Sequence, residues 1–75
     1  MSYVLKKDGK YGKGRTRYEA EWVEDIQEAR VFTRMGDAVN SRRHTFATKG
    51  RYYEATESEV EAIEIVPVRI VEEVG

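Results

Sequence analysis

The dipeptide Asp8-Gly9 restricts the fold of this chain more than any other feature of its sequence. Both central positions of the favoured two-residue hairpin turn need a positive φ, which Asp tolerates and Gly adopts freely. Ser2–Lys7 before the pair and Lys10-Tyr11 after it are typical of strands. The sequence therefore predicts two antiparallel strands joined at residues 8 and 9. Gly12 and Gly14 interrupt the return strand and predict a bulge or a loose tip.

A further strand is predicted over Thr16–Val23, because residues there alternate with a period of two. One set of side chains in such a strand faces the core and the other faces solvent. The inward set is Thr16, Tyr18, Ala20 and Trp22, and the outward set is Arg15, Arg17, Glu19 and Glu21. Trp22, the last inward residue, is interpreted as a core residue, with a binding hot spot as the alternative.

The middle of the chain predicts short helices and one short strand. Acidic residues and a three-residue apolar spacing within Val23–Ala29 fit a short helix or a single turn. Arg30–Phe32 is predicted to be a brief strand. Thr33 is the expected N-cap of a helix over Arg34–Arg43, whose buried face would hold Met35, Ala38 and Val39.

Two features are predicted between that helix and the last strand. His44–Glu54 is interpreted as a second hairpin that turns at Lys49-Gly50 and sets Phe46 opposite Tyr53. Thr56–Glu59 has the spacing of a capping box, in which two side chains satisfy backbone amides at the start of a helix.

The C-terminal segment is predicted to be a strand with a bulge. Ile63 and Ile65 share one parity, whereas the following apolar residues, Val66, Val68 and Ile70, share the other. A bulge at Val66-Pro67 would bring both sets onto the core face. Proline lacks an amide hydrogen, so an edge position or a bulge is favoured.

Together these elements predict an α+β fold, with a small antiparallel β-sheet of about 3–5 strands and one main helix packed on one face. At 75 residues the chain is expected to be a single domain, residues 1–75, with a thin core. Sixteen residues are Leu, Ile, Val or Phe, and the low net charge of −1 favours a folded chain over a disordered one. The expected core is Tyr3, Leu5, Trp22, Ile26, Phe32, Val39, Ile65, Val68 and Ile70.

The sequence lacks the residues that most enzyme mechanisms require. It has no cysteine, no Gly-x-Ser-x-Gly elbow and a single histidine, His44, which follows two arginines. No His-x-x-x-His or EF-hand spacing occurs, and Gly9, Gly12 and Gly14 do not have the spacing of a nucleotide-binding loop. We therefore expect no enzymatic activity and no bound metal or cofactor.

The chain is also expected to be a cytoplasmic protein that does not contact membranes. No stretch approaches the length of about 20 apolar residues that a membrane helix needs. The N-terminal residues lack the order of a signal peptide, and the absence of cysteine suits a reducing compartment.

The charged residues are grouped in blocks along the chain. Residues 1–18 carry a net charge of +5, residues 19–37 carry −4, residues 38–53 carry +4 and residues 54–75 carry −6. Such blocks can pair within the folded chain, or they can leave one basic face and one acidic face.

Nucleic-acid binding is one hypothesis that the basic blocks support. Proteins that bind single strands combine cations along the phosphate backbone with aromatic rings on which bases stack. The candidate phosphate contacts are Lys10, Lys13, Arg15, Arg17, Arg42, Arg43, Lys49 and Arg51, and the candidate stacking residues are Tyr11 and Tyr52. The slightly negative overall charge argues against this hypothesis.

Several short segments together resemble those of small phage and prophage proteins of unknown function. They are Tyr3-Val4-Leu5, Asp8–Tyr11, Trp22–Ile26, Ala29–Phe32, a helix that contains Ala38, and Ile65–Val68. The resemblance spans most of the chain, apart from Lys13–Arg17 and His44–Glu59. It implies a compact α+β domain expressed inside a bacterium, and it brings no known active-site residue to this sequence.

Two further hypotheses come from other functional classes. The leading one is a small non-enzymatic binding module, phage-derived as the resemblance implies, that acts on a host or phage macromolecule, with a protein as the expected partner. The other is a structural homo-oligomer, such as a homodimer, in which an exposed edge strand pairs across a two-fold axis.

Overall fold

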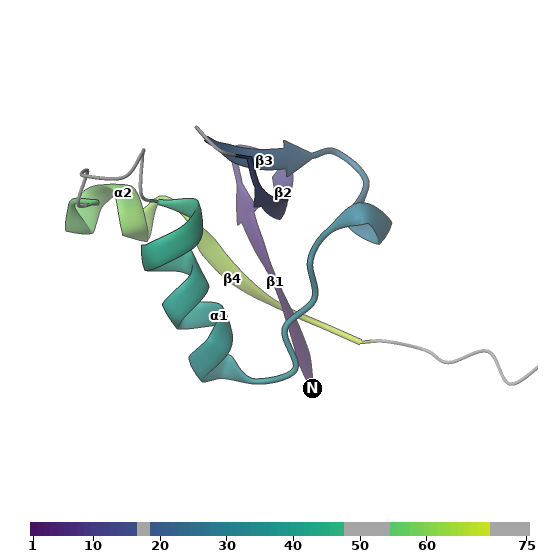
Figure 1. Cartoon of the computed structure of the whole chain (residues 1–75). Coiled ribbons are helices and arrows are strands. Elements are labelled where there is room, and N and C mark those ends of the chain that lie inside the picture. Colours follow the sequence, from purple (N-terminus) through teal and green to yellow (C-terminus); the bar gives the residue numbers. More distant parts are fainter. Residues whose placement is uncertain (17–18, 48–54, 70–75) are drawn as a thin grey trace, which may run out of the picture.

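The computed structural model describes residues 1–16, 19–47 and 55–69, and it confirms the α+β fold. Four antiparallel strands form one sheet in the order β3-β2-β1-β4 (Figure 1). They are β1 (Ser2–Lys7), β2 (Lys10–Arg15), β3 (Ala20–Val23) and β4 (Glu64–Val68). The helices are η1 (Ile26–Glu28), α1 (Met35–Ser41), η2 (Arg42–Phe46) and α2 (Glu57–Glu61). η1 is a 3₁₀ turn, and η2 is a π-helical turn that continues α1.

β1 and β2 form the hairpin that the sequence predicts. Asp8 and Gly9 have φ values of 50° and 79°, and Lys7 lies directly opposite Lys10. These positive φ values are those of the expected two-residue turn. The turn prediction is therefore confirmed.

β2 continues through both of its glycines and ends at Arg15. A bulge between Gly12 and Gly14 shifts its register against β3, as predicted. Gly12 is buried beneath the ring of Phe46, and a Cβ at this position would lie 2.6 Å from a ring carbon. Only glycine therefore lets the ring of Phe46 approach the sheet this closely.

The predicted strand over Thr16–Val23 is wrong at Thr16 and Glu19, and residues 17–18 lie outside the described residues. Thr16 begins a turn, in which its amide and its hydroxyl both donate to the carbonyl oxygen of Glu19. Such local hydrogen bonds compete with strand pairing, so β3 starts only at Ala20. Arg15 consequently ends β2 and lies directly opposite Ala20 in the neighbouring strand.

Arg30–Phe32 lies between β1 and β2, which pair directly only beside their turn. The amide of Arg30 donates to the carbonyl oxygen of Gly12 on β2, and Phe32 exchanges two backbone hydrogen bonds with Tyr3 on β1. The brief strand that the sequence predicts here is a single bridge, Tyr3 to Phe32. The segment thereby connects the two strands of the hairpin where they separate.

β4 pairs with β1 in one uninterrupted register along all five of its residues. The predicted bulge at Val66-Pro67 is therefore wrong. Ile65 packs against the core, whereas Val66 lies directly opposite Val4 on the other face of the sheet. Val4 is 1% exposed, so both faces of the sheet bury apolar side chains and no bulge is needed to bring them together.

The predicted edge position of Pro67 is confirmed. Tyr3 lies opposite Pro67 and directs its N–H and C=O groups to Phe32 on the other side of β1. In an antiparallel pair the opposite residue then also points its backbone groups away from the pair. The missing amide of Pro67 thus faces the open side of β4, where it breaks no bond of the sheet.

The core lies between one face of the sheet and the helices α1, η2 and α2. Its buried residues are Leu5, Phe32, Ala38, Phe46, Ala47, Val60 and Ile63, and the half-buried Tyr3, Ala20, Trp22, Ala55 and Ile65 pack against them. Two predicted core residues are wrong, because Ile26 is 42% exposed and Val39 is 43% exposed. Val68 is half-buried beside Val66, and Ile70 lies outside the described residues.

The main helix begins one residue later than predicted and ends later. Its N-cap is Arg34 rather than Thr33, and no side chain caps it. Ala38 is buried as predicted, but Met35 is exposed and Ser41 is buried. The helix continues as η2 to Phe46, so the predicted hairpin over His44–Glu54 is wrong for residues 44–47, and residues 48–54 lie outside the described part.

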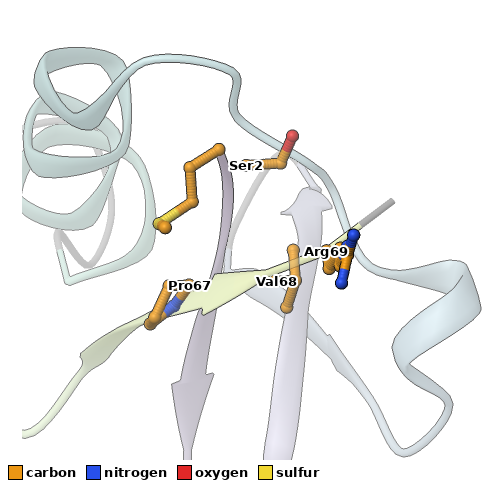
Figure 2. A pocket seen from close by; sticks show the side chains of 5 residues that line it. Ser2, Pro67, Val68 and Arg69 are labelled. Atoms are coloured by element: carbon orange, nitrogen blue, oxygen red, sulfur yellow. The ribbon is translucent and has the colours of Figure 1, made fainter. Parts of the chain in front are cut away.

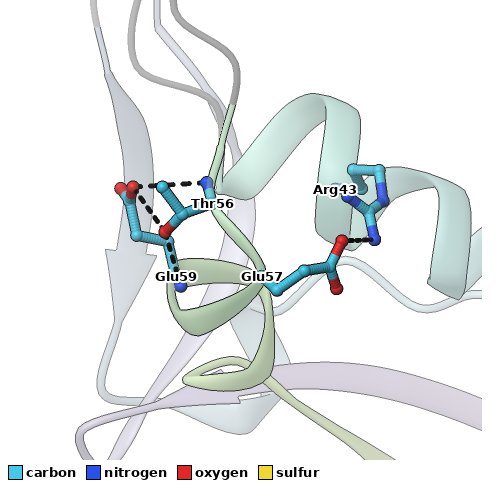
Figure 3. A network of polar contacts seen from close by, with 4 residues as sticks. All are labelled: Arg43, Thr56, Glu57 and Glu59. Atoms are coloured by element: carbon cyan, nitrogen blue, oxygen red, sulfur yellow. Dashed lines mark hydrogen bonds and ion pairs between the residues drawn. The ribbon is translucent and has the colours of Figure 1, made fainter.

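The capping box of α2 is confirmed (Figure 3). The amide of Glu59 donates to the hydroxyl oxygen of Thr56 at 3.3 Å, and the amide of Thr56 donates to a carboxylate oxygen of Glu59 at 3.4 Å.

Within the described residues, no helix has the length and apolar character needed to cross a membrane.

Candidate functional site

Arg15, one of the candidate phosphate contacts, forms a hydrogen bond within the fold. Its Nη1 donates to the carbonyl oxygen of Thr45 at 2.9 Å, which ties β2 to the π-helical turn η2. The expectation that Arg15 faces solvent is wrong. The turn at Thr16 sets Arg15 opposite Ala20, whose side chain packs against the core, so the arginine extends from the core face of the sheet toward η2.

Arg42 and Arg43 connect the main helix to the C-terminal part of the chain. Nη1 of Arg42 donates to the carbonyl oxygen of Ile63 at 3.4 Å, and its buried Nε has no hydrogen-bond partner among the described residues. Nη2 of Arg43 lies 2.7 Å from Oε1 of Glu57 (Figure 3). This ion pair is largely exposed and is worth about 0–1 kcal/mol. Both arginines therefore have contacts within the fold.

Lys10 and Lys13 are the exposed members of the predicted basic patch on β2. Tyr11 between them is half-buried, and the Nζ of Lys6 lies 5.7 Å from the centroid of its ring. The remaining candidates, Arg17, Lys49, Arg51 and Tyr52, lie outside the described residues. The basic patch as a whole therefore stays a prediction.

Among the residues that the structure describes, no strand pairs with the outer edge of β3. β3 is the last strand on its side of the sheet. Gly12 lies opposite Trp22 and accepts from the amide of Arg30 on its other side, so its backbone groups point away from β3. Trp22 must then point its own N–H and C=O to the open side of β3. Because this direction alternates along a strand, Ala20 points its backbone groups to the same side.

Acidic side chains surround this edge. Glu19, Glu21, Glu24 and Asp25 are all exposed. Asp25 accepts from the amide of Gln27 at 2.9 Å and so caps η1, whereas the three glutamates form no ion pair with any described residue. We call Ala20–Val23 together with Glu19, Glu24 and Asp25 the acidic edge.

The opposite edge of the sheet is less suited to pairing. On β4, the backbone groups of Ile65 and Pro67 point to the open side of the strand, and Pro67 has no N–H to donate. Proline on one edge and charged side chains on the other are the features by which natural sheets avoid pairing with their own copies. Two acidic edges would also bring Glu21 close to its counterpart, so a homodimer built from paired edges receives little support.

Two apolar hollows meet at the end of β4. One, of about 520 Å³, is lined by Met1, Ser2, Pro67, Val68 and Arg69 (Figure 2). The other, of about 360 Å³, is lined by Val4, Ile26, Gln27, Val31, Val68 and Arg69. A third hollow, of about 340 Å³ and mainly polar, lies between Arg30–Thr33 and α1. In the described part of the chain, no three His, Asp or Glu side chains are grouped to hold a metal ion.

Sequence reasoning missed the acidic edge as a candidate contact surface. The alternation of Glu19 and Glu21 with Ala20 and Trp22 was a signal for an exposed acidic row on a strand. It did not reveal that this strand lies at the end of the sheet, since strand order follows from long-range pairing. Trp22 has features of both interpretations, because it packs against the ring of Phe46 at a centroid distance of 5.4 Å and is only half-buried.

Comparison of the chain with protein-family models, with curated proteins and with solved structures found no match.

Proposed function

We propose that this chain is a small non-enzymatic binding module that accepts an extended segment of a partner protein as an additional strand beside β3. The observation that carries the proposal is the outward direction of the backbone groups of Ala20 and Trp22 on an end strand. In line with the resemblance to phage and prophage proteins, the partner would be a host or phage protein inside a bacterium.

Strand addition is a recognised mode of binding in which backbone hydrogen bonds supply affinity and side-chain pockets supply specificity. Each backbone hydrogen bond contributes about 0.5–1.5 kcal/mol. β3 has four residues, and only two of them point their backbone N–H and C=O groups to the open side. The contact is therefore short, and the complex should dissociate readily. Such weak contacts suit a module that occupies its partner transiently.

Replacing Ala20 with proline should abolish binding at this edge. The amide of Ala20 points away from β2, so its loss removes a donor to the partner and leaves the pairing with Arg15 intact. The proline ring also projects toward an incoming strand. We expect extended peptides selected from a displayed random library to bind Ala20→Pro at least about tenfold more weakly than wild type, a difference of about 1.4 kcal/mol.

Ala20→Gly is the control, because it also changes the side chain at this position but keeps the amide hydrogen that proline lacks. Its affinity for the selected peptides should stay within about threefold of wild type. Circular dichroism of both variants checks that the fold is retained. Selected peptides that bind Ala20→Pro as tightly as wild type would exclude strand addition at β3.

Nucleic-acid binding is the second candidate, and the exposure of Lys10 and Lys13 on β2 is the observation that favours it. The test uses Lys10→Ala/Lys13→Ala, since loss of Arg15 would also remove the hydrogen bond to Thr45. Phosphate contacts give a salt dependence with a slope of about −0.7 per contact on single strands. We expect no binding of fluorescent oligonucleotides at low salt. Binding that is lost with salt and in the double variant would favour the second candidate.

A further inference from the structure

The acidic edge also restricts the sequence of the partner, an inference that rests on the proposed strand addition. We infer that the added segment carries lysine or arginine at every second residue and apolar residues at the positions between them. The argument follows from the chemistry of the two faces of β3.

The two faces of β3 differ in the side chains that they present. Glu21 lies opposite Gly14, and Val23 lies opposite Tyr11 on the face of the sheet away from α1, η2 and α2. Ala20 and Trp22 lie on the other face, where they pack against the core. A strand added beside β3 continues both faces, so its side chains alternate between them in the same way.

The face that carries Glu21 favours cations. Glu21 is exposed, and Glu19 and Glu24 precede and follow β3, so an incoming segment meets negative charge along its length. On the neighbouring strand β2, Arg15 is turned toward Thr45 on the core side, and Lys13 lies in the bulge. Opposite charges that face each other across a strand pair attract, and like charges repel. A lysine or arginine beside Glu21 is therefore favoured, and a carboxylate there is disfavoured.

The face that carries Trp22 favours apolar side chains. The indole ring packs against Phe46 on one side and remains partly exposed at the edge of the sheet. An apolar side chain placed beside Trp22 would cover this exposed part and extend the core across the new strand. Because Trp22 is the only tryptophan in the chain, its fluorescence reports on this contact directly.

Charge complementarity also separates this partner from other occupants of the same edge. A second copy of the chain would bring its own Glu21 beside this one, and nucleic acid would bring phosphates next to carboxylates. Both are opposed by repulsion at low salt. A cationic, alternating segment is the occupant whose two faces match those of β3.

The test titrates the full-length chain with three capped hexapeptides in which valine alternates with lysine, threonine or glutamate, and it follows the fluorescence of Trp22. At low salt we expect the lysine peptide to bind at least about tenfold more tightly than the threonine peptide, and the glutamate peptide not to bind. Salt of about 0.5 M should remove most of the advantage of lysine, since exposed charges are then screened. Ala20→Pro should abolish the binding of every peptide.

A charge reversal at the edge supplies the matched comparison. Glu21→Lys should lower the affinity for the lysine peptide by at least about fivefold and should allow the glutamate peptide to bind. Glu61→Lys makes the same change of charge at an exposed position of α2, away from β3, and should leave the ratio between peptides unchanged.

The outcomes separate this inference from the proposed function. Wild type could bind the lysine and threonine peptides with equal affinity, and Ala20→Pro could bind neither. That result would overturn the inference and leave strand addition in place. Binding of the lysine peptide that survives in Ala20→Pro would overturn the inference, because the attraction would then need no strand pairing. No binding of any peptide at the edge would overturn the proposed function itself.

Discussion

Replacement of Phe46 by alanine is expected to lower the free energy of unfolding by about 3–5 kcal/mol. Phe46 is 5% exposed, and its ring lies over Gly12 of β2 and 5.4 Å from the ring of Trp22. The side chain of Phe46 thus packs the C-terminal end of the main helix against strands β2 and β3. A chain of this length has a total stability of about 4–11 kcal/mol, so the substitution should remove from about a quarter to all of it. Urea unfolding followed by Trp22 fluorescence measures the loss.

Two further variants keep this prediction testable if Phe46→Ala does not fold. Phe46→Leu retains most of the apolar volume and should cost about 1–2 kcal/mol. Val39→Ala truncates an exposed residue of the same helix and should cost less than about 0.5 kcal/mol. Equal losses for Phe46→Leu and Val39→Ala would show that the ring of Phe46 is not part of the core.

Replacement of Gly12 by alanine is expected to cost about 1–3 kcal/mol, the usual range for overpacking a core. The added Cβ would lie 2.6 Å from one carbon of the Phe46 ring and 3.0 Å from two others, so the ring must move. Gly14→Ala is the matched control in the same strand, because a Cβ there meets nothing within 4 Å. Urea unfolding of the two variants should give a clear difference in midpoint.

The clash at Gly12 also predicts coupling to Phe46. In a Phe46→Leu background the cost of Gly12→Ala should fall by at least half, since the smaller, flexible side chain can move away. Residues in direct contact show coupling energies of about 0.5–3 kcal/mol in such double-mutant cycles. Strictly additive losses would mean that the two residues do not contact each other in solution.

The sequence was sufficient for elements that depend on neighbouring residues. Asp8-Gly9 predicted the hairpin turn, and Thr56–Glu59 predicted the capping box, because both are closed by groups a few residues apart. Pro67 predicted an edge position or a bulge because of its missing amide, and the edge position is the one that the structure has. The alternation around Trp22 predicted which side chains of β3 meet the core.

The errors concern features that depend on distant parts of the chain. The prediction of a bulge in β4 assumed a single buried face, whereas Val4 is buried and Val66 is half-buried on the second face. Phe46 was assigned to a hairpin, because nothing near it in the sequence shows that the helix continues as a π-helical turn. In each case a contact with another element outweighed the local pattern.

The candidate site shows the same division. The sequence identified Arg15 as a cation on an exposed row, but the turn at Thr16 moved it to β2, where it donates to Thr45. It also displayed Glu19 and Glu21 as an acidic row without indicating that they flank an open edge. The charges of the acidic edge were therefore visible in the sequence, and its backbone groups were not.

By itself, the sequence determined the hairpin turn, the helix cap, the alternation of β3 and the charge of each segment, since these depend on the backbone preferences and spacing of adjacent residues. Only the tertiary structure decided the strand order, the two buried faces of the sheet, the position of Phe46 over Gly12 and the open edge at Trp22. The order of the strands depends on which distant segments can bury apolar surface against each other and also satisfy their backbone hydrogen bonds. Both conditions involve the whole chain, so no local stretch of sequence determines them.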